Sequence, residues 1–271
     1  MRSGYRSGIA IWGIAALVLA AAAYQTQSQR LHLGHPAVLS GWLLFAVMFG
    51  LVLFNLRKRL SMIPLGSASA WLALHTVGGA LAIGLFFIHA DTFWPTGSYE
   101  RLLTLLFYLV SLSGLLGFAI QRIYPRLLSQ INYEVIYERI PAEIAILRDQ
   151  AEAIVLECTA KTTSDTLAQY YLASLAWYFD RPRFMLNALV GNRRTRSWLD
   201  REWGAVARYL NAAENAFLSQ LLELCETKAK IDAHYAIQGL MKLWLLVHLP
   251  LAAAVMVVAV WHVLLVHVYA L

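Results

Sequence analysis

Apolar residues are gathered into five long stretches, separated by short polar segments and by one long one. The stretches run from Gly8 to Tyr24, Ala37 to Leu56, Ala70 to Ala90, Leu102 to Ile120 and Leu243 to Ala270. A helix needs roughly 20 apolar residues to cross the hydrocarbon of a bilayer. The pattern predicts five transmembrane helices. We interpret the first as a membrane span and not as a secretory signal, although Arg2 and Arg6 precede it.

The composition supports an integral membrane protein and gives its orientation. Of the 271 residues, 59% are hydrophobic and 14% are charged, which is more apolar than a typical soluble domain. Lys and Arg near the ends of spans stay on the cytoplasmic side. In a five-span arrangement one side collects Arg2, Arg6, Arg57, Lys58, Arg59 and Lys242. We therefore expect a bacterial inner-membrane protein with a cytoplasmic N-terminus and a periplasmic C-terminus.

The long polar segment between the fourth and fifth stretches predicts a separate cytoplasmic domain. Residues 121–238 carry 14 basic and 14 acidic residues, so the net charge of +6 lies in the remaining parts, where 8 basic residues face 2 acidic ones. This charge follows the membrane topology and excludes a nucleic-acid partner. The predicted fold is an all-α membrane bundle: residues 1–120 form four spans, residues 121–238 a cytoplasmic helical domain and residues 239–271 the fifth span.

Helical periodicity runs throughout this domain, and no alternating strand pattern occurs. Pro141 suits the first turn of one helix, and Ser164 or Asp165 is a candidate cap for a second helix that reaches Tyr178. A third run begins at about Glu202 and, after Gly204, contains no Pro or Gly before Gly239. We expect it to continue directly into the fifth span.

Two histidine pairs share one spacing and carry the candidate chemistry. His75 and His89 lie in the third stretch, His248 and His262 lie in the fifth, and each pair is fourteen residues apart. Fourteen helical residues rise about 21 Å and turn through about 1400°, close to four full turns. Both members of a pair thus face nearly the same way, and one helix can present a ligand to each of two haems.

The depth of the histidines predicts how they pair across the bundle. His75 follows Ala70 by five residues and His248 follows Leu243 by five, both at the cytoplasmic start of their spans. Since the third and fifth spans run parallel, His75 is expected to face His248, and His89 to face His262. Two neutral imidazoles on one haem iron leave no open position for oxygen, so such haems carry electrons. Hydrogen bonding to a neighbouring helix is the structural alternative, but ionisable residues inside a bilayer are usually functional.

The other histidines and the two cysteines have weaker signals. His267 follows His262 by five residues, which turns it about 140° away and makes it the second choice as a ligand. His32 and His35 precede the second span and are candidates for a quinone site, for a haem propionate contact or for no role. We expect a structural role for His234, and reduced structural thiols at Cys158 and Cys225.

The four histidines resemble the haem-binding core of cytochrome b in the bc1 and b6f complexes. They equally resemble the transmembrane domain of ferric reductases and NADPH oxidases, whose third and fifth spans carry such pairs. The resemblance implies that His75, His248, His89 and His262 are the axial ligands of two haem b groups. It covers 75–89 and 248–262 and does not extend to the cytoplasmic domain.

The departures from these families narrow the expected function. The glycines of the second and fourth spans, Gly41, Gly50, Gly114 and Gly117, do not follow the spacing of the bc-type cytochromes, although some of them can admit a porphyrin edge. The PEWY quinol motif is absent from the sequence, and so is a GxGxxG phosphate loop. The basic residues Arg181, Arg183, Arg193, Arg194, Arg196 and Arg201 are candidates for docking an acidic redox partner or anionic lipid, or form a solvated surface.

We therefore expect an electron-transfer subunit of a membrane oxidoreductase complex. It relays electrons across the membrane between the quinone pool and a partner redox protein, such as a c-type cytochrome or an iron–sulfur protein. One alternative is a ferric-reductase-like core that is fed by a separate cytoplasmic flavoprotein. The other is a membrane scaffold without redox chemistry that recruits partners through its cytoplasmic domain.

Overall fold

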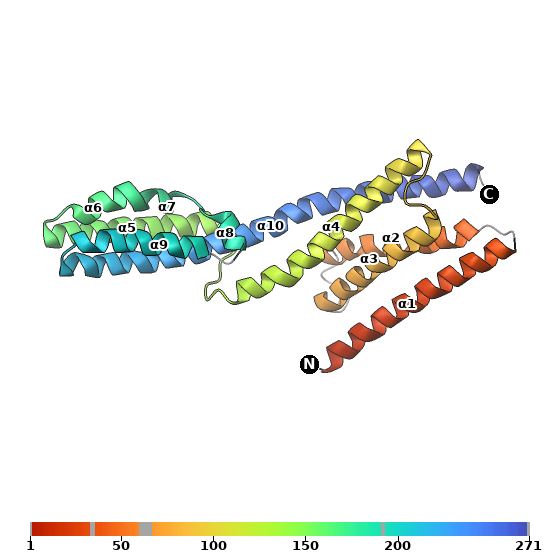
Figure 1. Cartoon of the computed structure of the whole chain (residues 1–271), viewed down its shortest axis with the longest axis horizontal. Helices are drawn as coiled ribbons and strands as arrows, with labels where there is room; N and C mark the ends of the chain where they lie inside the picture. The colour runs from red at the N-terminus through yellow and green to blue at the C-terminus, as the bar shows by residue number, and fades with distance from the viewer. Residues whose placement is uncertain (1, 33–35, 60–66, 191–192, 270–271) are drawn as a thin grey trace. The chain divides into compact units, whose positions relative to one another are not determined.

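Figure 1 shows the computed structural model, which describes residues 2–32, 36–59, 67–190 and 193–269. Within these ranges every regular element is helical and no strand occurs. Five of the described helices are long and apolar enough to cross a membrane. The predicted all-α class with five such helices is confirmed. By its internal contacts the chain divides into two units, Met1–Phe118 with Trp244–Leu271, and Ala119–Leu243.

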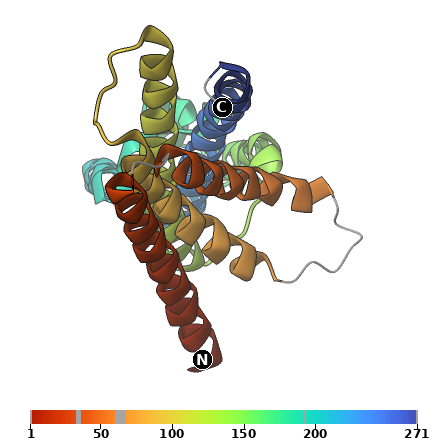
Figure 2. The same cartoon turned by 90° about the vertical axis from the view of Figure 1, so that its right-hand side faces the viewer.

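The first unit is a bundle of long apolar helices. It contains α1 (Arg2–Leu31), α2 (Pro36–Arg59), α3 (Ala68–Ala90), most of α4 (Ser98–Ser129) and the C-terminal part of α10 (Ala212–Tyr269). The N-terminal end of α1 and the C-terminal end of α10 lie at opposite ends of this unit (Figure 2). Such an arrangement is what an odd number of passes through one layer produces.

Glycines set the close approach of α2 to α3. A Cβ atom on Gly78 would lie 3.0 Å from the side chain of Leu51, and one on Gly41 would lie 2.8 Å from the ring of His89. Because residue numbers rise along α2 as they fall along α3, the two helices are antiparallel. Small residues let membrane helices pack closely, so these glycines position the end of α3 against the start of α2.

Polar contacts fix α4 antiparallel to α10. The indole nitrogen of Trp244 donates to the carbonyl of Ser113 at 2.8 Å, and the hydroxyl of Tyr99 donates to the carbonyl of Val258 at 2.7 Å. A stack of Phe86 on Phe107, with ring centres 4.3 Å apart, joins α3 to α4 in the buried core of the unit. The core thus lies among the helices that carry the four candidate histidines.

The second unit is a bundle of shorter helices packed on the N-terminal part of α10 (Figure 1). Its elements are η1 (Tyr137–Arg139), α5 (Ile140–Thr162), α6 (Thr166–Tyr170), the π-type turn η2 (Tyr171–Leu175), α7 (Ala176–Asp180), α8 (Met185–Leu189), α9 (Arg193–Val206) and η3 (Ala207–Tyr209). As predicted, Pro141 lies in the first turn of α5, and a helical segment follows Asp165 and passes Tyr178.

The predicted start of the third helix of this unit is wrong. Glu202 lies inside α9, the chain then turns through η3, and α10 begins at Ala212. The break comes from a capping box: the side chain of Asn211 accepts from the amide of Glu214, whose carboxylate accepts from the amide of Asn211, both at 2.8 Å. From Ala212, α10 is continuous through Gly239 to Tyr269, as expected for a helix that enters the fifth apolar stretch.

Candidate functional site

The four histidines meet as two pairs, each of which joins α3 to α10. The ring centres of His75 and His248 lie 6.4 Å apart, and those of His89 and His262 lie 6.3 Å apart. All four residues are half-buried. Contacts at both levels require α3 and α10 to run in the same direction, so the helices present two equivalent ring pairs at two heights.

The separation of the rings matches two imidazoles on one metal ion. A metal–imidazole bond is about 2 Å long and the ring centre lies roughly 1.1 Å beyond the nitrogen, so axial ligands place their ring centres roughly 6.2 Å apart. The ring planes are inclined at 78° in the first pair and 83° in the second. The angle between the ring planes does not decide the matter, because an imidazole can rotate about a metal–nitrogen bond. The distance between the ring centres does, and in both pairs it suits axial ligation.

His89 is held by α2 in a defined orientation. Its Nδ1 atom lies 3.0 Å from the carbonyl oxygen of Ala37 and 3.4 Å from the hydroxyl of Ser40. A carbonyl oxygen only accepts hydrogen bonds, so Nδ1 carries the proton and the lone pair of Nε2 is left free. A metal-bound histidine typically donates its other N–H in this way.

His248 has a comparable anchor on α4. The hydroxyl of Ser113 lies 3.2 Å from Nδ1 of His248, and the Trp244 ring stacks on the imidazole with ring centres 5.2 Å apart. A Cβ atom on Gly114 would lie 3.8 Å from Cε1 of His248. Serine, tryptophan and glycine therefore define the position of the His248 ring and leave its Nε2 atom without a hydrogen bond to any described residue.

His75 has no anchor at Nδ1 like those of His89 and His248. Its Nδ1 atom is buried and has no hydrogen bond to the part of the chain that the structure describes. Its nearest aromatic neighbour is Phe54, with ring centres 4.8 Å apart. A buried polar atom without a partner costs about 1–3 kcal/mol, and the ring of His75 lies 6.4 Å from that of His248.

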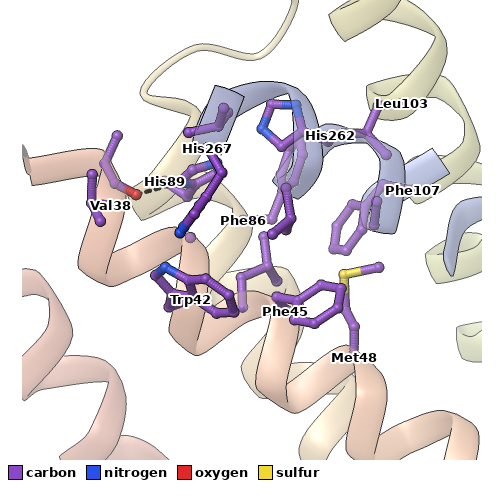
Figure 3. A pocket seen from close by; sticks show the side chains of 16 residues that line it. Val38, Trp42, Phe45, Met48, Phe86, His89, Leu103, Phe107, His262 and His267 are labelled. Carbon is purple, nitrogen blue, oxygen red and sulfur yellow. Dashed lines mark hydrogen bonds between the residues drawn. The ribbon is translucent and has the colours of Figure 1, made fainter. Parts of the chain in front are cut away.

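An apolar cavity adjoins the pair formed by His89 and His262 (Figure 3). Its volume is about 100 Å³. Binding sites for cofactors are mostly apolar. Side chains of α2, α3, α4 and α10 line it, among them Trp42, Phe45, Met48, Phe86, Leu103 and Phe107. The cavity thus places an apolar lining beside the two imidazoles.

His267 lies in the same cavity but is not part of the ring pair. It is exposed, and its ring makes an edge contact with Trp42 at 5.8 Å between ring centres. The ring of His262 faces His89 and lies 6.2 Å from the ring of Tyr99. The structure therefore gives the position opposite His89 to His262.

The remaining histidines are not brought to either pair. His32 is exposed at the end of α1, and His35 lies outside the described residues. His234 is buried in the second unit, where its Nδ1 atom lies 3.2 Å from the amide nitrogen of Gln238. Cys158 and Cys225 are buried and free, as expected for structural thiols.

The glycines singled out in the sequence have unequal roles. Gly41 contacts His89 and Gly114 contacts His248, one glycine for each pair. Gly117 instead makes room for Trp244, and a Cβ atom on Gly50 would meet nothing within 4 Å. The sequence could not distinguish these, because a glycine becomes informative only when the neighbouring helix is known. The same is true of Ser113 and the Ala37 carbonyl, which carry no motif of their own.

The described residues contain no cluster of three or more His, Cys, Asp or Glu side chains that could hold a metal ion. Two axial ligands are sufficient for a haem iron, because the porphyrin supplies the other four. No protein-family model matches the chain, and neither a curated protein nor a solved structure shows significant similarity to it. The likeness to cytochrome b therefore rests on this chain's own histidines and their geometry.

Proposed function

We propose that this protein is a membrane cytochrome that holds two haem b groups and relays electrons across the membrane. The observation that carries the proposal is the repeated ring pair, with ring centres 6.4 and 6.3 Å apart at two levels of the same two helices. His75 and His248 would hold one haem, and His89 and His262 the other. When bound, each haem iron supplies one-electron chemistry.

The residues of the chain define how such groups are held. The carbonyl of Ala37 keeps the Nδ1 proton of His89 in place, so that Nε2 points its lone pair at the ligand position. The hydroxyl of Ser113 can accept a hydrogen bond from Nδ1–H of His248 in the same manner. If each iron took two of these histidines as ligands, no position would be open for oxygen and the groups would favour electron transfer.

The apolar core between the two levels supports transfer without leakage of water. Phe86 and Phe107 stack there, and Leu85, Val255 and Ala259 are buried around them. A rise of fourteen helical residues separates the levels by about 21 Å, which distributes the two groups between the two halves of a bilayer. The bundle is thus suited to carry electrons across the membrane.

The proposed orientation places the second unit in the cytoplasm and the C-terminus in the periplasm of a bacterial inner membrane. Its basis is the basic residues beside the spans, Arg2, Arg6, Arg57, Lys58, Arg59 and Lys242. The electron partners in this proposal are the quinone pool and a separate redox protein, such as a c-type cytochrome or an iron–sulfur subunit of the same complex.

The test is the haem content of the purified chain, measured as the pyridine haemochrome. We expect two haem b groups per chain, and one group in the His89→Ala variant, with the component that remains unchanged in its redox titration. A chain without haem would contradict the proposal and favour a membrane scaffold without redox chemistry. Loss of both groups, or of neither, in the variant would contradict the pairing of His89 with His262.

His267→Ala is the matched control, because His267 lies on the same helix and lines the same cavity as His262. We expect this variant to keep both haem groups, whereas His262→Ala keeps one. If instead His267→Ala loses a haem and His262→Ala retains both, the ligand opposite His89 is His267.

A further inference from the structure

The second unit presents an apolar patch at α8 that its own core does not use. It is formed by α8 and the residue after it: Met185, Leu186 and Val190 are 46%, 80% and 85% exposed. Leu186 and Val190 are four residues apart and share one side of the turn. Large exposed apolar patches on soluble domains commonly mark a surface that binds a membrane or a protein.

The opposite side of α8 is firmly attached. Ala188 is buried against Ala233 and Ala236 of α10, and Phe184, just before α8, packs on Trp198 with ring centres 5.6 Å apart. The exposed side chains are therefore not the frayed end of a loop. They are held outward by a turn whose inner face belongs to the core of the unit.

Arginines lie on both sides of the patch in the sequence, and the exposed residues Asp180 and Asp200 lie just outside them. Between Arg181 and Leu199 the chain has five arginines and no acidic residue. The side chains of Arg181 and Arg196 are exposed, and Arg183 lies over the ring of Trp177 at 4.9 Å. An apolar face flanked by arginines suits the head-group region of a bilayer, where apolar side chains enter the acyl boundary and basic ones meet anionic phosphates.

Contacts inside the second unit also place α8 near the segment of α10 that leads into the fifth apolar stretch. Ala236, against which α8 packs, precedes the apolar stretch at Leu243 by seven residues, roughly 10 Å along a helix. Ile131, which also packs there, follows the end of α4 by two residues. Both neighbours of α8 thus lie close in sequence to membrane spans.

We propose that α8 docks on the surface of the membrane in which the spans of this chain are embedded, with Leu186 and Val190 in the head-group region and the flanking arginines bound to anionic lipid. This inference rests on the membrane insertion of the apolar helices and not on the presence of haem. It assigns the basic segment to lipid and not to an acidic redox protein.

The experiment uses the full chain in lipid nanodiscs, with an environment-sensitive NBD fluorophore on Leu186→Cys and nitroxide-labelled lipid as a quencher. Leu156→Cys is the matched control. Leu156 is also exposed, at 71%, but it lies on α5 sixteen residues, or roughly 24 Å, beyond Ile140, the residue at which that helix begins. Because both native cysteines are buried, the unmutated chain, treated in the same way, gives the background.

We expect quenching at position 186 to exceed that at position 156 by about twofold or more in discs that contain anionic lipid. The pair Arg181→Gln and Arg196→Gln should reduce it, since these side chains are exposed and their removal leaves the core intact. Equal quenching at the two positions would overturn the proposal. Quenching at position 186 that is the same in neutral and anionic discs would overturn its assignment to anionic lipid. Neither readout depends on haem.

Discussion

Gly41 shows how a single residue can define a ligand position. It lies on α2 opposite the ring of His89, and a Cβ atom there would come within 2.8 Å of Cε1 and 3.1 Å of Nδ1. Contacts this close force something to move. The ring is also tied to the carbonyl of Ala37 one turn earlier, so it cannot move without loss of its hydrogen bond.

Under the proposed function, we predict that Gly41→Ala weakens the binding of the haem at the His89 level and leaves the other unchanged. Overpacking of this kind costs about 1–3 kcal/mol, which would lower the affinity at the His89 level by roughly 5- to 150-fold. The measurement is haem per chain together with a redox titration that resolves the two components. Gly50→Ala on the same helix is the control, because its Cβ atom would meet nothing within 4 Å. Equal haem loss in both variants would contradict a specific role for Gly41.

A buried ion pair connects helices of the second unit. Lys228 and Asp232 of α10 are 0% and 4% exposed, and Nζ lies 2.6 Å from Oδ2. The ammonium also donates to the carbonyl of Arg181 at 2.9 Å and lies 4.2 Å from the centre of the Tyr178 ring. The pair therefore connects α10 to α7 and to the segment that leads into α8.

Removal of one member of this pair is predicted to be more harmful than removal of both. Lys228→Met leaves the Asp232 carboxylate buried without its cation, which costs about 3–5 kcal/mol. In Lys228→Met with Asp232→Leu, most of that loss should be recovered. The free energy of unfolding in detergent measures both effects.

The matched control for this prediction is Lys161→Met. Lys161 pairs with Glu157 at the same spacing and distance, 2.6 Å, but the two side chains are 64% and 52% exposed. An exposed pair is worth less than about 1 kcal/mol. If Lys161→Met and Lys228→Met destabilise the protein equally, burial of the second pair has no special effect.

The same pair predicts a pH dependence on the acidic side. Burial raises the pKa of Asp232 from 3.8 to about 6, although the Lys228 ammonium opposes this rise. The folded protein binds this proton more tightly than the unfolded chain does. Protonated Asp232 therefore contributes stability to the fold at low pH, and this contribution is lost as the pH rises through about 6. We expect the stability of the native protein relative to Asp232→Asn to fall between about pH 4 and about pH 7. Unfolding curves that stay parallel over this range would contradict the assignment.

At the scale of the whole molecule, the helix directions agree with five passes through one layer. Arg30 at the end of α1 pairs with Asp91 at the end of α3 at 2.9 Å, so these two helices run in the same direction. The histidine pairs give α10 the direction of α3. The first, third and fifth of the long apolar helices thus share one direction, as alternating passes require.

This topology predicts which residues are accessible from each side of the membrane. Thr96 is exposed between α3 and α4, and Leu156 is exposed on α5. A membrane-impermeant thiol reagent should label Thr96→Cys in spheroplasts, but Leu156→Cys only after the membrane is opened. The reverse pattern would invert the proposed orientation, and labelling of both from outside would contradict a cytoplasmic second unit.

Much of the fold could be predicted from local patterns. The five apolar stretches and the helical periodicity of the second unit depend only on residues close in sequence, and the described helices follow them. The predicted start of α10 is wrong because Asn211 and Glu214 form a capping box that interrupts an otherwise helical pattern. These two residues are visible in the sequence, but the long run without Pro or Gly around them favours an unbroken helix.

The sequence by itself determined the levels of the four histidines, because a fourteen-residue spacing on a helix fixes both height and direction. Only the tertiary structure decided what holds the rings of His89 and His248. The carbonyl of Ala37, the open backbone of Gly41 and the hydroxyl of Ser113 reach the histidines from other helices. Contacts of this kind depend on the register between helices, which no local pattern specifies. The choice of His262 over His267 opposite His89 likewise became visible once α3 and α10 were packed together.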